Sequence, residues 1–337
     1  MRVMITGGTG FIGYHTARCL LDAGHEVSLL VRSVDKMLNL YGEGCIDRYT
    51  RGDITDVRKV RKAMEGCDAV IHTAAMVSTH GSDAQQVYYT NTQGARTVLG
   101  TAVEQGIGAI IHVSSVTALF DPDLDLLDEH SPPGKAASGY GRSKVACEKY
   151  VRELQAQGQP VYTTYPASVI GPQDPGLTEP NEAMRTFLTS LVPNMSSGNQ
   201  YVDVRDVAQV HLQLLEERPP PGRYLLGGHY VPWRDLAGVL ERITGRKLRR
   251  VYLNGPMMRL AGRAFDLLTP RLNLDIPVTE EGMIYATNWV PMDNGKVERE
   301  LGFTFRPLEE SMADCIRWLC EAGYISEEQA GAVVRAG

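Results

Sequence analysis

The chain has 337 residues, a formal net charge of −6 at pH 7, 43% hydrophobic residues and 22% charged residues. This length fits one large domain with a smaller lobe, and the composition is ordinary for a globular protein. The sequence has no basic stripe, which argues against nucleic acid as a partner, and no run of 18 apolar residues, which argues against a membrane span.

The spacing of the cysteines and histidines favours neither a C-x-x-C motif nor a metal site. The six cysteines form no C-x-x-C pair, and a strand is predicted from Arg2 onward. We therefore expect no cleaved leader, reduced thiols and a cytoplasmic protein. The eight histidines form no recognisable metal-ligand pattern, so we expect no metal site.

A glycine-rich turn follows the first predicted strand. The apolar run Val3-Met4-Ile5 leads into Thr6-Gly7-Gly8-Thr9-Gly10-Phe11-Ile12-Gly13, after which a helical pattern begins. A strand, a glycine turn and a helix in this order are typical of dinucleotide binding. Gly7 permits a tight turn, Gly10 lets backbone N–H groups approach a pyrophosphate, and Gly13 lets the helix pack closely on the strand. We expect cofactor contacts from Gly7, Gly10, Phe11, Ile12 and Gly13.

The second predicted strand ends at Val31-Arg32-Ser33. An acidic residue is expected about 20 positions beyond the glycines when a site binds the ribose 2′-hydroxyl of NAD. Arg32 holds that position, and Lys36 follows closely. A guanidinium suits a 2′-phosphate, which a carboxylate would repel, so we expect NADP rather than NAD. Two alternatives stay open: Asp35 could reach the ribose if the turn is shifted, and Arg32 could stack on adenine without selecting a phosphate.

Through residue 165, short β-branched runs alternate with longer helical patterns. Such alternation builds an α/β fold of the Rossmann type, a doubly wound parallel sheet with helices on both faces. Strands are predicted at Val3–Ile5, Val27–Val31, Asp47–Tyr49, Ala69–Thr73, Ala109–Ser114 and Val161–Tyr165, and helices near 11–23, 56–65, 85–105 and 139–157.

The pattern changes after Tyr165. Breaker-rich loops are predicted at 171–180 and 193–200, followed by a helix near Asp206 and one more sheet strand at 223–226. The remainder is mostly helical, and its amphipathic stretch at 257–268 favours packing on its own domain over membrane contact. We expect residues 1–171 and 201–230 to form the nucleotide-binding domain, and residues 172–200 and 231–337 to form a smaller, mostly helical substrate lobe.

Ser114 and Ser115 end the predicted strand at 109–114, where open α/β sheets bind ligands. Downstream, Tyr140 and Lys144 are four residues apart at the start of a predicted helix, and so share one face. An ammonium group favours a neighbouring phenolate, as does a positively charged nicotinamide. Tyr140 could therefore exchange a proton with a substrate oxygen that Ser115 holds. The alternative is a buried tyrosine beside a solvated lysine.

Together these motifs resemble the extended short-chain dehydrogenases/reductases, a superfamily that includes NAD-dependent epimerases/dehydratases and dihydroflavonol reductase-like proteins. The likeness covers most of the chain and is strong through about residue 230. It rests on Thr6–Gly13, Gly52–Asp56, Val70–Ala75, Asn91, Val113–Ser115, Asp128-Glu129, Tyr140–Lys144, Tyr165–Ala167 and Tyr201–Ala208.

The resemblance implies that Ser115, Tyr140 and Lys144 are the catalytic trio, with Ser115 rather than Ser114 as the active hydroxyl. It also implies cofactor contacts and a supporting role for Asn91. Those contacts would come from Asp53, Ile54, Ala74, Ala75, Tyr140, Lys144, Pro166 and Ser168. Two segments depart from the family pattern: Tyr165 stands where many members have arginine, and Ala118-Leu119-Phe120 replaces Val-Tyr-Gly.

Three functions remain open. We favour an NADP-dependent carbonyl reductase or alcohol dehydrogenase, because Arg32 and the trio suit one. A nucleotide-sugar epimerase would recycle a tightly held cofactor, usually NAD, and a non-catalytic NADP-sensing protein would usually lack the tyrosine or the lysine. We expect substrate contacts from Met76, Val77, Val116 and Ser168, and the resemblance allows a homodimer through the helices near 85–105 and 139–157.

Overall fold

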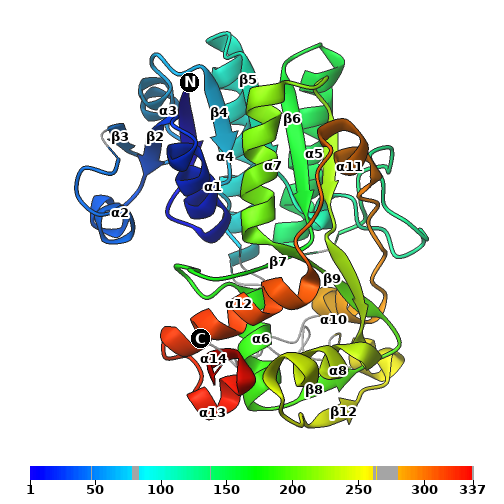
Figure 1. Ribbon diagram of the computed structural model, residues 1–337. Coiled ribbons are helices and arrows are strands. Elements are labelled where there is room, and N and C mark those ends of the chain that lie inside the picture. Colours follow the sequence, from blue (N-terminus) through cyan, green and yellow to red (C-terminus); the bar gives the residue numbers. More distant parts are fainter. Residues whose placement is uncertain (47, 78–82, 137, 261–262, 264–279, 336–337) are drawn as a thin grey trace.

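The computed structural model describes residues 1–46, 48–77, 83–136, 138–260, 263 and 280–335. Its central sheet consists of β1 (Arg2–Thr6), β2 (Glu26–Val31), β3 (Arg48–Arg51), β4 (Ala69–His72), β5 (Ala109–Val113), β6 (Val161–Pro166) and β10 (Arg223–Leu226). The seven strands lie in the order β10-β6-β5-β4-β1-β2-β3, and each neighbouring pair is parallel (Figure 1). The strand order therefore reverses beside β1, where sheets of this type bind ligands beyond their carboxyl ends.

Helices cover both faces of this sheet. Met4 and Ile5, neighbours in β1, belong to two different hydrophobic clusters, because successive side chains of a strand point to opposite faces. The Ile5 cluster is covered by α1 (Phe11–Asp22), α2 (Val34–Tyr41), α7 (Val204–Glu217) and α11 (Gly295–Leu301), and the Met4 cluster by α3 (Val57–Ala63), α4 (Ala84–Glu104) and α5 (Gly139–Ala156).

Side-chain caps fix where several of these helices begin. Ser33 caps α2, Asp56 caps α3, Ser138 caps α5 and Asp203 caps α7, and each accepts a hydrogen bond from a backbone N–H of the first turn. Such a cap satisfies a donor that has no partner inside the helix. The N-cap of α1 is Gly10, which has no side chain for this purpose. Backbone N–H groups in the first turn of α1 are therefore left for a ligand.

The second lobe lies below the central sheet in Figure 1, at the end where the parallel strands finish. It contains two small sheets with strand orders β11-β9-β7 and β12-β8. Their strands are β7 (Ser168–Ile170), β8 (Val192–Asn194), β9 (Gly198–Asp203), β11 (His229–Pro232) and β12 (Arg250–Tyr252). The helices of the lobe are α6 (Glu179–Thr189), α8 (Trp233–Thr244), α10 (Glu280–Thr287), α12 (Leu308–Glu321), α13 (Glu327–Ala330) and α14 (Ala332–Arg335).

The predicted Rossmann-type sheet with a helical C-terminal lobe is confirmed, and the predicted strands and helices lie within two residues of the observed ones. The predictions differ from the structure in two respects. Several elements were not predicted, namely α2, β7, α6, β11 and β12. Residues 193–200, predicted as a loop, contain most of β8 and the start of β9. The domain boundary predicted between residues 200 and 201 falls inside β9, and the division into domains stays a prediction. Asp47 and most of the stretch at 257–268 lie outside the described residues.

Among the described helices, none is long and apolar enough to cross a bilayer. The six cysteines are free thiols. Within the ranges given above, the structure has no group of three or more His, Cys, Asp or Glu side chains that could hold a metal ion.

Candidate active site

The turn between β1 and α1 is too tight for side chains at two of its glycines. Gly7 has a φ of 74°, in the left-handed region that favours glycine. A Cβ atom on Gly13 would overlap the carbonyl oxygen of Gly7 and lie 2.7 Å from Thr73 Oγ1. At Gly10, by contrast, a Cβ atom would meet, among the described residues, only that Gly7 oxygen, at 3.3 Å. The turn thus packs closely on the sheet while the space beside Gly10 stays open, which fits a pyrophosphate.

A cavity of about 270 Å³ opens beside this turn, at the carboxyl ends of β1, β2 and β4. Arg32 and Lys36 are exposed at its edge, and in the described part of the chain neither cation has a carboxylate partner. Asp35, in the first turn of α2, does not line the cavity. The lining includes many of the residues predicted for cofactor binding: Gly7, Gly10, Arg32, Lys36, Asp53, Ile54, Ala74 and Ala75.

The first turns of α5 carry the tyrosine and the lysine. Ser138 caps this helix at Gly141 N, which places Tyr140 and Lys144 one turn apart on it. Lys144 is only 5% exposed, its Nζ donates to Val113 O at 3.4 Å, and it lies 5.7 Å from the centroid of the Tyr140 ring. The lysine charge is therefore held between the end of β5 and the phenol, where it can stabilise a phenolate.

The serine pair at the end of β5 is divided between two environments. Ser114 is buried, and its Oγ has no hydrogen-bond partner in the described structure. Ser115 is half-buried and caps the short 3-10 helix η2 (Val116–Ala118), with its Oγ bonded to Thr117 N and Thr117 Oγ1. Thr117 in turn lines the same cavity as Tyr140. This placement is compatible with the choice of Ser115 as the reactive hydroxyl, which stays a proposal.

Asn91 connects three parts of the site. Its side chain accepts a hydrogen bond from Met76 N (2.7 Å) and donates to Met76 O (3.0 Å), so it holds the loop that follows β4. It also donates to Ser143 Oγ (2.9 Å), which itself donates to Tyr140 O (2.6 Å). Asn91 is 4% exposed and acts as a brace from within α4. We infer that it positions the cofactor loop and the start of α5 relative to each other.

A second cavity of about 310 Å³ adjoins Tyr140 on the side of the second lobe. Its wall contains three large aromatic side chains, Trp233, Tyr285 and Trp289. The indole nitrogens are already used, because Trp233 Nε1 donates to Ala286 O (2.7 Å) and Trp289 Nε1 donates to Gln200 Oε1 (3.1 Å). The lining also includes Val77, Thr117, Ser138, Ser168, Glu179, Asn199, Gly282 and Ala286. A largely apolar compartment therefore lies next to the phenol.

Some predicted residues lie elsewhere than expected. Met76, predicted for substrate, lines the first cavity, and Ser168, predicted for both ligands, lines the second. Val116 is 7% exposed and packs in a hydrophobic cluster with Leu119 and Phe120. Phe11, Ile12, Gly13 and Pro166 line neither cavity, and their contacts stay predictions.

Sequence reasoning missed a buried histidine pair beneath the site. His72 in β4 and His112 in β5 are stacked with ring centroids 5.5 Å apart. Burial, with a smaller contribution from the Lys144 ammonium, lowers the pKa of His72 to about 3, and burial also holds the pKa of His112 well below its usual range. Both rings therefore stay neutral, and the positive charge beside them is that of Lys144. The apolar pattern of β5 concealed the pair.

Tyr165, at the position where many relatives have arginine, is fully buried. Its hydroxyl donates to Glu148 Oε2 (2.7 Å), and Arg152 Nε donates to Glu148 Oε1 (2.5 Å). Burial and the adjacent carboxylate keep the pKa of Tyr165 well above its usual range. Glu148 is one turn beyond Lys144 on α5, so this network joins the end of β6 to the helix that carries the catalytic candidates.

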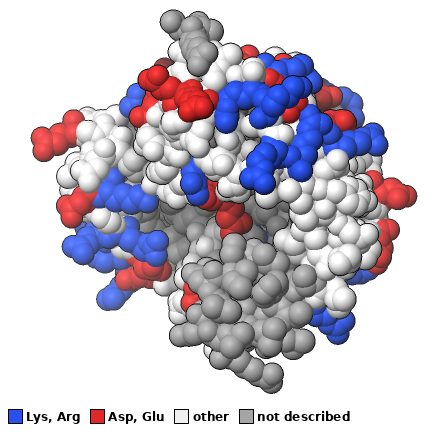
Figure 2. All heavy atoms as spheres, turned by 90° about the horizontal axis from the view of Figure 1, so that it is seen from below, with Lys and Arg blue, Asp and Glu red and all other residues white. Residues whose placement is uncertain are grey.

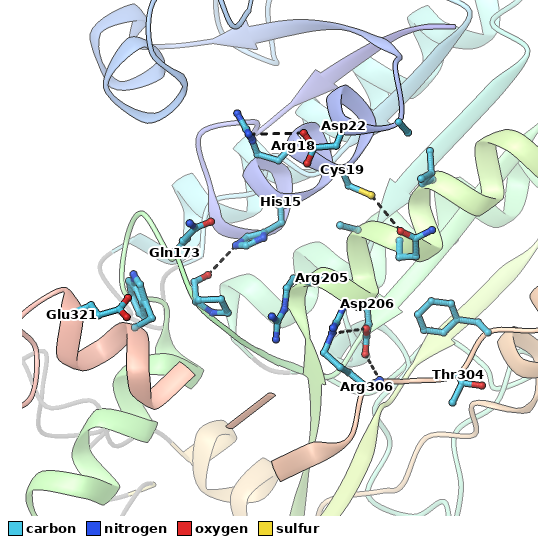
Figure 3. A pocket seen from close by; sticks show the side chains of 17 residues that line it. His15, Arg18, Cys19, Asp22, Gln173, Arg205, Asp206, Thr304, Arg306 and Glu321 are labelled. Atoms are coloured by element: carbon cyan, nitrogen blue, oxygen red, sulfur yellow. Dashed lines mark hydrogen bonds and ion pairs between the residues drawn. The ribbon is translucent and has the colours of Figure 1, made fainter. Parts of the chain in front are cut away.

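A larger hollow of about 1040 Å³ lies between α1, α7 and α12 (Figure 3). His15 and Arg18 face it from α1, and Arg205 and Asp206 face it from α7. Arg205 Nη2 lies 2.7 Å from Asp203 Oδ2 and 2.8 Å from Asp314 Oδ2. Carboxylates of the same chain therefore neutralise the Arg205 guanidinium in this hollow. The ion pair between Arg205 and Asp314 connects α7 to α12. The face seen from below likewise has both charge signs around a central hollow (Figure 2).

Comparison with known proteins identifies the family. The family model for the NAD dependent epimerase/dehydratase family matches residues 3–227. The chain belongs to this family. Members of the family bind a nicotinamide dinucleotide, and they include oxidoreductases, epimerases and dehydratases.

Within the NAD dependent epimerase/dehydratase family, the chain is similar along its length to proteins named as reductases. It is 30% identical to a putative dihydroflavonol 4-reductase of Synechocystis sp. over 334 residues, which are 96% of each chain. The solved structure of vestitone reductase from alfalfa has a TM-score of 0.72 and 23% identity, and covers 96% of this chain and 99% of its own. A UDP-glucose 4-epimerase of Neisseria meningitidis is 33% identical over 163 residues, 46% of this chain and 48% of the epimerase.

Proposed function

We propose that this chain is an NADP-dependent carbonyl reductase or alcohol dehydrogenase that acts on a ketone or aldehyde with an apolar body. The observation that carries the proposal is the cavity beside Tyr140. Among its described lining residues are three large aromatic side chains and no lysine or arginine to hold a sugar diphosphate. An epimerase that acts on nucleotide sugars needs such cations, because a diphosphate is bound by charge-assisted hydrogen bonds.

The residues at the first cavity support NADP as the cofactor. Arg32 directly follows β2 and Lys36 lies in the first turn of α2. Neither has a carboxylate partner in the described structure, and so both are available to a 2′-phosphate. The open space at Gly10 and the uncapped first turn of α1 suit the pyrophosphate. Lys144 would hold the hydroxyls of the nicotinamide ribose.

The mechanism assigns one task to each member of the trio. When bound, the nicotinamide supplies the hydride that a carbonyl carbon receives. Tyr140 donates its hydroxyl proton to the carbonyl oxygen, which completes the alcohol and leaves a phenolate. Lys144 stabilises that phenolate from its buried position. Ser115 would turn its hydroxyl from Thr117 Oγ1 and donate a hydrogen bond that holds the substrate oxygen. In the oxidative direction, Tyr140 takes the proton back from the alcohol.

A panel of ketones, aldehydes and nucleotide sugars tests the proposal. We expect one molecule of NADPH to be oxidised for each carbonyl reduced. We expect Tyr140→Phe to lower turnover by about a hundredfold or more, the typical contribution of a positioned proton donor, with NADPH affinity nearly unchanged. Conversion of a nucleotide sugar without net loss of NADPH absorbance would instead establish an epimerase. Equal turnover of Tyr140→Phe and wild type would remove Tyr140 from the mechanism.

A further inference from the structure

The cavity beside Tyr140 contains one charged side chain among its described lining residues, the carboxylate of Glu179. Other polar groups in the wall already have protein partners. Ser168 Oγ donates to Asn199 Oδ1 (3.0 Å), and Thr117 Oγ1 accepts a hydrogen bond from Ser115 Oγ (3.2 Å). In the part of the chain that the structure describes, Glu179 has no ion-pair or hydrogen-bond partner for its carboxylate. The cavity therefore offers a ligand an unoccupied acceptor as well as the phenol of Tyr140.

The backbone that carries Glu179 is held in place by a buried aspartate. Asp174 is 3% exposed, and its Oδ2 accepts hydrogen bonds from Thr178 N and Thr178 Oγ1, both at 2.6 Å. The same oxygen accepts from Asn181 Nδ2 (3.0 Å). These bonds fix the residues on either side of Glu179 at the start of α6. The carboxylate thus projects from a rigid support, as a group that recognises part of a ligand should.

Glu182, one turn further along α6, shows what a structural glutamate looks like on this helix. It forms an ion pair with Arg185 and does not line the cavity. Glu179 is an exposed residue that has no such partner among the described residues, and it lines the cavity. The two residues have the same charge and lie on the same helix, so they form a matched pair for an experiment.

We propose that Glu179 is a specificity-determining residue. It accepts a hydrogen bond from a hydroxyl or ammonium group at the end of the substrate remote from its carbonyl, and it excludes substrates with an anionic group at that end. This inference rests on the proposed function, because it takes Tyr140 as the site of the reacting carbonyl. The substrate class is then a carbonyl compound with an apolar, preferably flat body and a remote hydrogen-bond donor.

The chemistry of the wall supports this class. Trp233, Tyr285 and Trp289 offer apolar faces to the middle of such a molecule. A carboxylate accepts hydrogen bonds and donates none, so a second carboxylate or a phosphate placed against it would be repelled. A phenolic or aliphatic hydroxyl and an ammonium group would both be bound. Nucleotide sugars and other phosphorylated carbonyl compounds are excluded on the same ground.

The test measures binding of four probes to the protein saturated with NADP⁺, by calorimetry. The probes are benzylacetone and its para-hydroxyl, para-aminomethyl and para-carboxyl derivatives. For the wild type we expect the dissociation constant of the aminomethyl probe to be about tenfold below that of the carboxyl probe, which corresponds to about 1.4 kcal/mol. Glu179→Gln should abolish this difference, and Glu179→Lys should reverse it. Glu182→Gln should keep the wild-type ratio.

The outcomes separate this inference from the proposed function. Equal affinities of the wild type for the aminomethyl and carboxyl probes would overturn the role of Glu179. The role would also be overturned if Glu179→Gln and Glu182→Gln reduced the preference for the aminomethyl probe by the same factor. Absence of binding by every probe would overturn it as well. If the probes bind in the expected order but none is reduced with NADPH, the role of Glu179 stands and the reductase proposal fails. A KM difference between probes at nearly constant kcat would support both.

Discussion

Gly10 and Gly13 of the β1–α1 turn give the sharpest test of the cofactor site. The structure predicts that an added methyl group lowers the stability of the fold at Gly13 and the affinity for NADPH at Gly10. An added methyl group at Gly13 would overlap the Gly7 carbonyl and crowd Thr73, so the backbone of β1 and α1 must separate. Overpacking of this kind costs about 1–3 kcal/mol. At Gly10 the methyl group would have a single close neighbour, the Gly7 oxygen at 3.3 Å. Its cost to the free protein should therefore be a few tenths of a kcal/mol.

NADPH binding should respond to the two substitutions differently from stability. The same methyl group on Gly10 would occupy the space in which backbone N–H groups approach a pyrophosphate. Gly10→Ala should therefore melt within about 1 °C of the wild type and bind NADPH at least tenfold more weakly, a change of about 1.4 kcal/mol. Gly13→Ala should melt several degrees lower. Thermal denaturation without cofactor and NADPH titration by fluorescence measure the two quantities.

The reasoning fails if Gly13→Ala melts like the wild type, because the close approach of α1 to β1 would then be absent in solution. It also fails if Gly10→Ala binds NADPH with unchanged affinity, because the pyrophosphate would then lie away from this turn. Gly24→Ala serves as a control outside the turn. A Cβ at Gly24 would meet no atom of the described residues within 4 Å, although the φ of 82° at this position adds backbone strain.

Three further predictions concern charge and burial. Arg32→Asp should change the ratio of the NADP⁺ to the NAD⁺ dissociation constant by at least tenfold in favour of NAD⁺, since a guanidinium is replaced by a group that repels a 2′-phosphate; an unchanged ratio in equilibrium titrations would refute the assignment. Tyr165→Phe should lower the free energy of unfolding by about 1–3 kcal/mol, because the buried Glu148 loses a hydrogen bond; urea denaturation checks this, and an unaltered midpoint would contradict it. Burial lowers the pKa of His211 to about 3, against about 6.5 in an unfolded chain, so the unfolded state binds more protons and stability falls as the pH falls below 6.5. The loss from this histidine should be about 2 kcal/mol between pH 7 and pH 5, and His211→Gln should remove that part of the pH dependence.

The sequence predicted the part of the fold that follows from simple periodicity. Strands buried on both faces, such as Ala109–Val113, show almost continuous apolar runs, and the helices between them are long enough to show a clear pattern. Helix α2 escaped notice because it has eight residues and buries only Met37 and Tyr41. Short elements with two buried side chains do not show a period.

Strand β9 was missed for a different reason. Its residue Gln200 is polar but 3% exposed, and its side-chain Oε1 accepts hydrogen bonds from Met292 N (2.7 Å) and Trp289 Nε1 (3.1 Å). These partners are about 90 residues further along the chain, so local sequence shows only a polar residue near a glycine. A short stretch of sequence therefore cannot show that a residue is buried when its burial depends on a partner far along the chain.

The same distinction applies to the site. Tyr140 and Lys144 could be paired from their spacing, because one helix carries both. Their positions after β2 allowed Arg32 and Lys36 to be assigned to the nucleotide cavity, which both of them line. Glu179 could not be found in this way, since it reaches the cavity only through the packing of the second lobe. Its one local signal is its position at the start of a helix after a loop rich in proline and glycine.

The order of strands has a consequence for synthesis of the protein. β6 is buried along its whole length between β5 and β10, yet β10 is made only after the segment that forms α6, β8, β9 and α7. While the ribosome translates that segment, β6 has an open edge of unpaired backbone groups, which can pair with another chain. The nascent polypeptide is therefore exposed to aggregation until Leu226 emerges, and a chaperone that covers β6 in this interval would raise the yield of folded protein.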